Sequence, residues 1–290
     1  MKIMFFPLLV NSFYYANLRL EIQSDPMRRF LFTTSSLFLI TVTSWASDSS
    51  STLIVLVQNT RLRMLVGQYC ETKKRWIKPD VPFHAPVYQS TFTLFSAEGY
   101  LQTVQIDEIP KPWDPIPWDW SSTITSWHDH GNDYALGLSG IWEKQRFVVD
   151  PSSVTVPENQ LTFLQEYLQK KHLYDPTTIT QTLTVDVDHD GILDHLLAVN
   201  GETVSLILMN NQVLVDHSAP RPKDRDLDEQ HRLYGEPGFS QVLAIVDIDH
   251  DGIAEIVTLT VFPSTGPKIT IFSVVNGTIV KKLSTALLYF

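Results

Sequence analysis

Short runs of alternating apolar and polar side chains, separated by turn residues, make up most of the chain. Residues 52–57 are an apolar, β-branched run, and residues 88–106 hold two such runs around Ala97-Glu98-Gly99. Residues 134–142 and 145–149 have the same character. A period of two between turn residues is typical of β-strands. The pattern predicts a mainly β fold.

One segment has a helical period instead. Its larger apolar residues recur at three- and four-residue spacing, at Leu161, Leu164, Tyr167 and Leu168. Pro157 precedes the segment and suits a first helical turn. We therefore expect a single helix over residues 158–172.

The last third of the chain contains an internal repeat. LTVDVDHDGILDHLLAV (183–199) matches LAIVDIDHDGIAEIVTLTV (243–261), with Asp186 and Asp247 at equivalent places 61 residues apart. The similarity continues into TVSLILMNNQVLV (203–215) and KITIFSVVNGTIV (268–280).

Asn210-Asn211 and Asn276-Gly277 interrupt these last two segments, and such pairs favour tight hairpin turns. Each unit therefore predicts a strand, an acidic loop, a second strand and a hairpin, which makes four strands. Recurring four-stranded units are the building blocks of β-propellers. The fold-class prediction is mainly β, with propeller-like four-stranded repeats. A closed propeller, a partial stack of sheets and a small β domain with two repeats stay open as alternatives.

The acidic loops, residues 186–194 and 247–255, follow the pattern DxDxDGxx(D/E). Glycine at position 6 permits a tight curl, which brings the carboxylates of positions 1, 3, 5 and 9 and the carbonyl of position 7 together. Such carboxylates repel one another unless a cation neutralises them. Oxygen ligands in a flexible loop favour Ca²⁺ over Zn²⁺, Cu²⁺ or Mg²⁺. The predicted ligands of two Ca²⁺ sites are Asp186, Asp188, Asp190, Ile192 (carbonyl) and Asp194, and Asp247, Asp249, Asp251, Ile253 (carbonyl) and Glu255.

The EF-hand is the main alternative type of calcium-binding loop, and the sequence does not fit it. An EF-hand loop ends with a bidentate Glu at position 12. Position 12 is Leu197 in the first loop and Thr258 in the second, both inside predicted strands. His189 and His250 occupy position 4, where we expect exposed turn residues with left-handed backbone angles.

VDVDHDGILDHLLAV and VDIDHDGIAEIV resemble FG-GAP (VCBS-type) repeats, which occur in integrin α-chain propellers and in many secreted bacterial proteins. The resemblance covers about residues 180–285. It implies Ca²⁺ binding, β-propeller architecture and a role in adhesion or ligand binding rather than catalysis. The chain departs from the family pattern by His at position 4 of both loops and by Glu255 at position 9 of the second.

The start of the chain indicates export. Residues 27–46 combine Arg28 and Arg29 with an apolar stretch and the small-residue site Ser44-Trp45-Ala46, as in a secretory signal peptide. Cleavage after Ala46 would give a secreted or periplasmic protein. The alternative is that residues 1–46 are retained as a membrane anchor.

The domain prediction has three parts. Residues 1–46 form an upstream extension with the signal peptide, 52–175 a mostly β region with one helix, and 176–290 the two repeats. The formal net charge of −10 argues against a nucleic-acid partner, because phosphate binding needs clustered Lys and Arg. The single cysteine, Cys70, excludes disulfides within the chain and cysteine-based metal centres.

Three function hypotheses follow, of which the third is an anchored subunit of a surface complex, if residues 1–46 are retained. The first is an exported, non-catalytic protein that is stabilised by Ca²⁺ and binds a protein or carbohydrate ligand. The second is a secreted hydrolase whose active site lies in residues 87–150, with the repeats as an accessory module. Its only support is the Trp127–Asp133 segment, in which His128 and His130 could ligate a metal or act in acid–base chemistry. Separately, Trp113, Trp118 and Trp120 lie in a proline-rich loop and could stack on sugar rings or protein partners.

Overall fold

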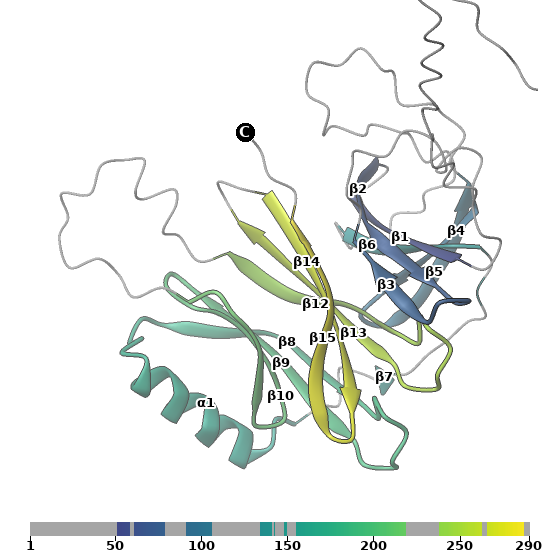
Figure 1. Cartoon of the computed structure of the whole chain (residues 1–290). Helices are drawn as coiled ribbons and strands as arrows, with labels where there is room; N and C mark the ends of the chain where they lie inside the picture. Colours follow the sequence, from purple (N-terminus) through teal and green to yellow (C-terminus); the bar gives the residue numbers. More distant parts are fainter. Residues whose placement is uncertain are drawn as a thin grey trace, which may run out of the picture. The chain divides into compact units, whose positions relative to one another are not determined.

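Antiparallel pairing of short strands builds three sheets (Figure 1). The computed structural model describes residues 51–58, 61–78, 91–105, 134–140, 142, 148–149, 155–218, 238–262 and 266–286. Strands dominate these segments and α1 (Glu158–Lys170) is the one long helix among them, so the mainly β prediction is confirmed. All described residues belong to one compact unit, Trp45–Phe290.

The first sheet has six strands in the order β3-β2-β1-β6-β4-β5. Its strands are β1 (Ser51–Gln58), β2 (Arg61–Cys70), β3 (Arg75–Ile77), β4 (Thr91–Ser96), β5 (Gly99–Gln105) and β6 (Tyr134–Ser139). The predicted hairpin around residue 98 is β4 and β5. The sequence did not predict β2 and β3, because Arg61 and Arg63 dilute the start of that run and Gly67 interrupts it.

The two repeats fold as two separate sheets. The second sheet runs β11-β10-β9-β8-β7 and the third runs β12-β13-β14-β15. Each repeat contributes four consecutive antiparallel strands, as predicted. The strands are β7 (Val148–Val149), β8 (Thr177–Val185), β9 (Asp194–Gly201), β10 (Ser205–Met209), β11 (Gln212–Asp216), β12 (Phe239–Val246), β13 (Glu255–Phe262), β14 (Gly266–Val275) and β15 (Thr278–Ala286).

The hairpin turns carry left-handed residues where the sequence predicted them. Asn210 has φ 51°, and Asn276 and Gly277 have φ 50° and 69°. Asn and Gly tolerate this region because steric cost is low for them there. These turns fix the register of β10 with β11 and of β14 with β15.

The third sheet buries apolar side chains on both of its faces. In β13, Ile256 joins a core cluster with Val185 and Ile207 of the second sheet. The next residue, Val257, points the other way and joins a cluster with Leu136 of the first sheet and Ile271. Successive side chains of a strand lie on opposite faces, so a strand that is covered on both sides reads as a nearly continuous apolar run.

Helix α1 covers the remaining face of the second sheet (Figure 1). Leu164 packs into a cluster with Leu197 and Leu206 of the sheet. The Tyr167 hydroxyl donates a hydrogen bond to the Asp216 carboxylate at the end of β11. The helix ends two residues before the predicted boundary, and His172 beyond it has a φ of 57°.

Two amide side chains of the second sheet bind the edge of the third. The Asn200 side chain donates to the Ser240 carbonyl and accepts from the Ser240 N–H, both at 2.9 Å. Gln181 does the same for Val242, at 3.1 and 2.8 Å. An unpaired strand edge needs such partners when it is buried. The two amides therefore fix the edge of β12 against the second sheet.

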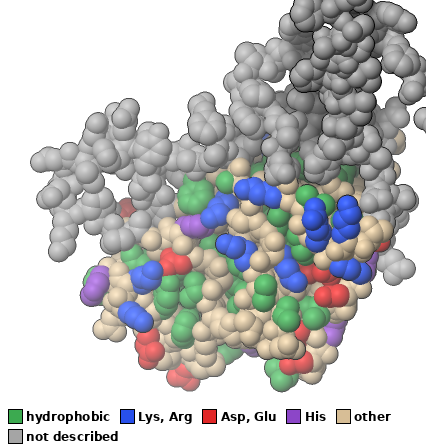
Figure 2. All heavy atoms as spheres, in the orientation of Figure 1, with side chains coloured by type: hydrophobic (Ala, Val, Ile, Leu, Met, Phe, Trp, Pro, Cys, Tyr) green, Lys and Arg blue, Asp and Glu red, His purple; other side chains and the backbone are tan. Residues whose placement is uncertain are grey.

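Lys and Arg side chains gather on the face over β3, β14 and β15 (Figure 2). Arg75 and Lys281 are exposed on β3 and β15, two strands that contact each other. These residues lie far apart in the sequence, so their spacing along the chain does not indicate a common surface.

A close approach between the first and third sheets depends on Gly67 in β2. A Cβ atom there would collide with the Leu283 side chain of β15 and would lie 3.0 Å from the Ile77 carbonyl oxygen. We expect Gly67→Ala to destabilise the protein by about 1–3 kcal/mol, the usual cost of overpacking. Urea unfolding would measure it.

The same substitution can be made in a Leu283→Ala protein to test whether its cost is steric. Truncating Leu283 opens a cavity by itself, but it also removes the side chain that the new methyl group would meet. Gly67→Ala should therefore cost less in the Leu283→Ala protein than in the wild type. Equal costs in the two backgrounds would contradict a steric origin.

The described strands form three antiparallel sheets, and no closed barrel or propeller is formed among them. None of the helices in the described segments has the length and apolar character of a membrane span. Residues 1–46, Trp113, Trp118, Trp120 and the segment 127–133 lie outside the described residues.

Candidate metal centre

Both acidic loops follow the first strand of a repeat. The first loop joins β8 to β9, and the second joins β12 to β13. In the first, the Asp186 carboxylate accepts hydrogen bonds from the N–H groups of Asp190 (3.1 Å) and Gly191 (3.0 Å). The curl that the spacing predicts is thus closed by the position-1 carboxylate.

The second loop repeats these contacts. The Asp247 carboxylate accepts from the N–H groups of Asp251 (3.2 Å) and Gly252 (3.1 Å). Strands flank both loops, and position 12 lies within β9 or β13. The loops are therefore not EF-hands.

Left-handed backbone at positions 4 and 6 makes the curl possible. His189 and His250 have φ values of 57° and 56°, and Gly191 and Gly252 have 84° and 88°. Both histidines are exposed, so the expectation of exposed left-handed turn residues is confirmed. Only glycine adopts the position-6 values without strain.

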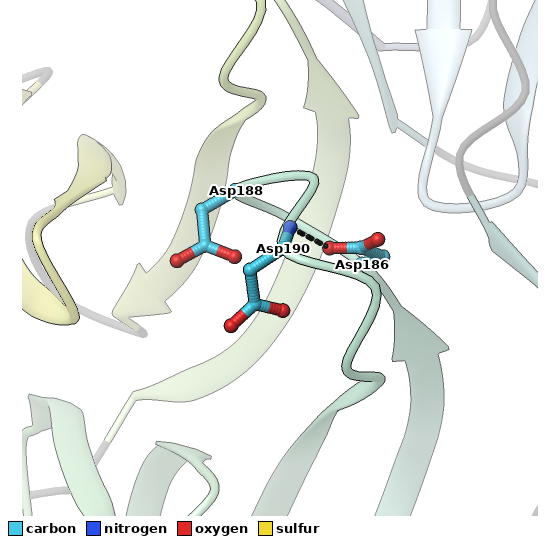
Figure 3. Close-up of side chains that lie close together, drawn as sticks. All are labelled: Asp186, Asp188 and Asp190. Atoms are coloured by element: carbon cyan, nitrogen blue, oxygen red, sulfur yellow. Dashed lines mark hydrogen bonds between the residues drawn. The ribbon is translucent and has the colours of Figure 1, made fainter.

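The first loop brings together the carboxylates of positions 1, 3 and 5. Oxygen atoms of Asp186, Asp188 and Asp190 lie within 4.8 Å of one another around a single turn (Figure 3). Asp194, the predicted fourth carboxylate, is engaged elsewhere. It accepts from the Val187 N–H at 3.1 Å and from the Asn210 amide at 2.9 Å.

The second loop brings together a different set, positions 1, 3 and 9. Oxygen atoms of Asp247, Asp249 and Glu255 lie within 4.8 Å of one another. Asp251 is exposed, and its carboxylate accepts from the Ile253 N–H at 2.8 Å. The longer arm of Glu255 thus reaches a place that Asp194 does not reach in the first loop.

Burial distinguishes the second group from an ordinary acidic turn. Glu255 is fully buried and Asp249 is 7% exposed. One oxygen of Glu255 accepts from the Ile248 N–H at 2.8 Å. The other Glu255 oxygen, Oε1, and Asp249 Oδ1 are buried without any hydrogen-bond partner.

The electrostatics of the group follow from this burial. Desolvation, and next the nearby Asp249, raise the pKa of Glu255 to about 9. Burial, and then Asp251, raise the pKa of Asp249. Ionised carboxylates in such a place cost several kcal/mol each unless a cation compensates them. Two unpartnered buried oxygens and an all-oxygen donor set fit a hard metal ion.

Most of the predicted carboxylate ligands lie in the two acidic groups. Both loops hold an acidic group that could bind a metal ion. Each group contains three of the predicted carboxylates, and Asp194 and Asp251 lie outside them. Ile192, whose carbonyl is a predicted ligand, has a side chain that is 69% exposed, whereas Ile253 is half-buried.

The second loop contacts residues that the sequence did not associate with it. The Trp142 ring stacks on His250, with centroids 4.7 Å apart and planes at 20°. Burial, and then the charge of Asp249, raise the pKa of Tyr69 in β2. Nothing in the spacing of these residues signals the contact, because the sheets meet only in the folded chain.

The two loops are joined to each other directly. The N–H of Ala254, at position 8 of the second loop, donates to the carbonyl of Val187, at position 2 of the first, at 2.9 Å. Val187 and Ala254 are both fully buried in the cluster between the second and third sheets. Ile248, at position 2 of the second loop, belongs to a cluster with residues of the first sheet, so this loop lies where all three sheets meet.

The raised pKa of Glu255 predicts an unusual pH dependence of the metal-free protein. The unfolded side chain titrates near 4.3, so the stability that comes from the neutral buried carboxyl is fully present below that pH. It is lost as pH rises toward about 9, by up to about 1.4 kcal/mol per pH unit. Other groups titrate too, so the informative quantity is the difference in melting temperature between Glu255→Gln and the wild type at the same pH.

With a chelator present, the stability of Glu255→Gln relative to the wild type should increase between pH 5.5 and pH 8. Thermal melts at the two pH values would measure it. If the melting temperatures of the two proteins changed equally with pH, burial of an unpartnered Glu255 carboxyl would be contradicted.

Comparison with known proteins adds no further constraint on the site. No protein-family model, no curated protein and no solved structure matches the chain. The similarity of the loops to FG-GAP repeats therefore rests on the residues quoted above.

Proposed function

We propose that the chain is an exported, non-catalytic β-repeat protein that binds Ca²⁺ in its two acidic loops and depends on it for stability. One observation carries the proposal. The second loop buries two carboxylate side chains, each with an oxygen that has no hydrogen-bond partner, within reach of a third carboxylate.

The choice of Ca²⁺ follows from the donor atoms. The grouped side chains are all carboxylates, and Ca²⁺ accepts six to eight oxygen ligands in adaptable geometry. Mg²⁺ requires a nearly octahedral arrangement, and Zn²⁺ prefers nitrogen or sulfur. The histidine of each loop, at position 4, is outside both groups.

The role of the ion would be structural. A cation at the second loop neutralises carboxylates at the junction of β12 and β13, where all three sheets meet. Because the unfolded chain holds no preformed site, binding energy there favours the folded state.

Export is consistent with this role. Residues 27–46 have the form of a signal peptide, and extracellular calcium modules commonly work at 10⁻⁴ to 10⁻³ M. Such weak sites would be filled outside the cell. The family that the loops resemble implies a ligand-binding role of the same kind.

Titration calorimetry of the chelator-treated protein with CaCl₂ tests the proposal. We expect heat of binding for Ca²⁺ at micromolar to submillimolar concentration, and much weaker binding of MgCl₂. Asp249→Asn should remove one site, and Asp188→Asn should weaken the other. Absence of heat with Ca²⁺ up to 10 mM would refute the proposal.

A further inference from the structure

A cleft opens at the end of β8 and β12 that lies away from the acidic loops. Its volume is about 760 Å³, within the usual range for ligand pockets. The first strands of both repeats line it, together with the β4–β5 turn and the start of β6. The loops follow the other ends of β8 and β12, so the cleft is separate from the metal centre.

Exposed apolar side chains mark this cleft. Phe239 is 47% exposed and Ile179 is 36% exposed, although both lie in strands. Tyr134 adds a second aromatic ring to the lining. An exposed aromatic ring in a concave site is a platform on which a ligand can stack.

The rest of the lining combines apolar side chains with uncharged polar ones, and one residue is charged. Thr182 and Gln241 supply a hydroxyl and an amide group, and Glu98 is the single charged residue. No Lys or Arg is among the described residues that line the cleft. Anionic ligands are therefore disfavoured, and a ligand rich in hydroxyl groups can exchange hydrogen bonds with the lining.

The strand edge at the cleft argues against an extended peptide. A peptide would bind by adding a strand to an open edge. On β12 the backbone groups of Ser240 and Val242 are already paired with the amides of Asn200 and Gln181. Recognition must therefore come from side chains.

We propose that this cleft binds a neutral oligosaccharide, with a sugar ring stacked on Phe239 and ring hydroxyls bonded to Thr182 and Gln241. Sugars present an apolar ring face and a periphery of hydroxyl groups, which is the combination that this lining offers. The site goes beyond the proposed calcium role and does not require bound metal.

Binding of cellohexaose, maltohexaose, chitohexaose and mannohexaose to the full chain, measured by titration calorimetry in 1 mM CaCl₂, tests the proposal. We expect at least one of them to bind with a Kd below 1 mM. Phe239→Ala should weaken it about tenfold or more, since aromatic side chains dominate such contacts. Phe239→Tyr retains the ring and should retain binding.

Val275→Ala is the matched control, because Val275 is 39% exposed and is not among the residues lining the cleft. Binding should be unchanged in this variant and in the wild type when excess EGTA replaces CaCl₂, so failure of the calcium proposal would not be confused with failure of this one. Thermal melts verify that each variant is folded.

Three outcomes would overturn the oligosaccharide site. One is that none of the four sugars binds at 10 mM. Another is that binding is the same in Phe239→Ala. The third is that heptapeptides selected from a random library bind in a Phe239-dependent way while the sugars do not.

Discussion

Chelation of calcium should lower the melting temperature of the protein by about 10 °C or more. At a calcium concentration of about one hundred times Kd, each site stabilises the folded state by about 2.7 kcal/mol. Two sites would contribute about 5 kcal/mol, and each kcal/mol shifts the melting temperature by about 2–4 °C in a protein of this size. Melts in 5 mM CaCl₂ and in excess EGTA would measure the difference.

The Glu255→Gln substitution should have different effects on the stability of the metal-free protein and on its stabilisation by calcium. Without metal, the Glu255 carboxyl is buried and its pKa is raised to about 9, so it is neutral at pH 7. A neutral amide of the same shape should therefore leave the metal-free protein as stable as the wild type, or more stable. It should also reduce the calcium-dependent shift by about half, because the second site loses a charged ligand.

Glu166→Gln is the matched control for this substitution. Glu166 is exposed on α1, so its substitution by Gln removes one negative charge away from both loops. Its calcium-dependent shift should equal that of the wild type. A full shift in Glu255→Gln, or no effect of EGTA on the wild type, would contradict a metal ion at the second loop.

Asn200→Leu should destabilise the protein by about 2–5 kcal/mol. The Asn200 side chain pairs with both backbone groups of Ser240 and also donates to the Thr180 hydroxyl at 2.7 Å. Ser240 is fully buried. Leucine has similar volume but no polar atoms, so the Ser240 N–H and carbonyl would lose their partners, at about 1–3 kcal/mol for each buried group.

Urea unfolding gives the change in free energy, and Gln212→Leu serves as the control. Gln212 is an exposed polar residue of β11 in the same sheet. Its replacement should change stability by less than about 0.5 kcal/mol. A cost for Asn200→Leu no larger than that of the control would show that the edge of β12 does not depend on the amide.

The sequence alone predicted the elements whose signals are local. The repeat, its four-stranded units and the Asn-containing turns follow from alternation and turn chemistry within a few residues. The helix was predicted from its spacing, with an error of two residues at its end. The strands β2 and β3 were missed, because Arg61 and Arg63 obscure the apolar run, and Gly67 is explained only by its contact with Leu283 of a distant strand.

The sequence also determined which residues form each acidic loop, since the curl is a local structure closed by the position-1 carboxylate. Only the tertiary structure decided which carboxylates come together, and how deeply they are buried. In the first loop the nearby Asn210 engages Asp194, whereas in the second the neighbouring sheets bury Asp249 and Glu255. Desolvation depends on what packs around a group, and the residues that cluster with the second loop come from all three sheets.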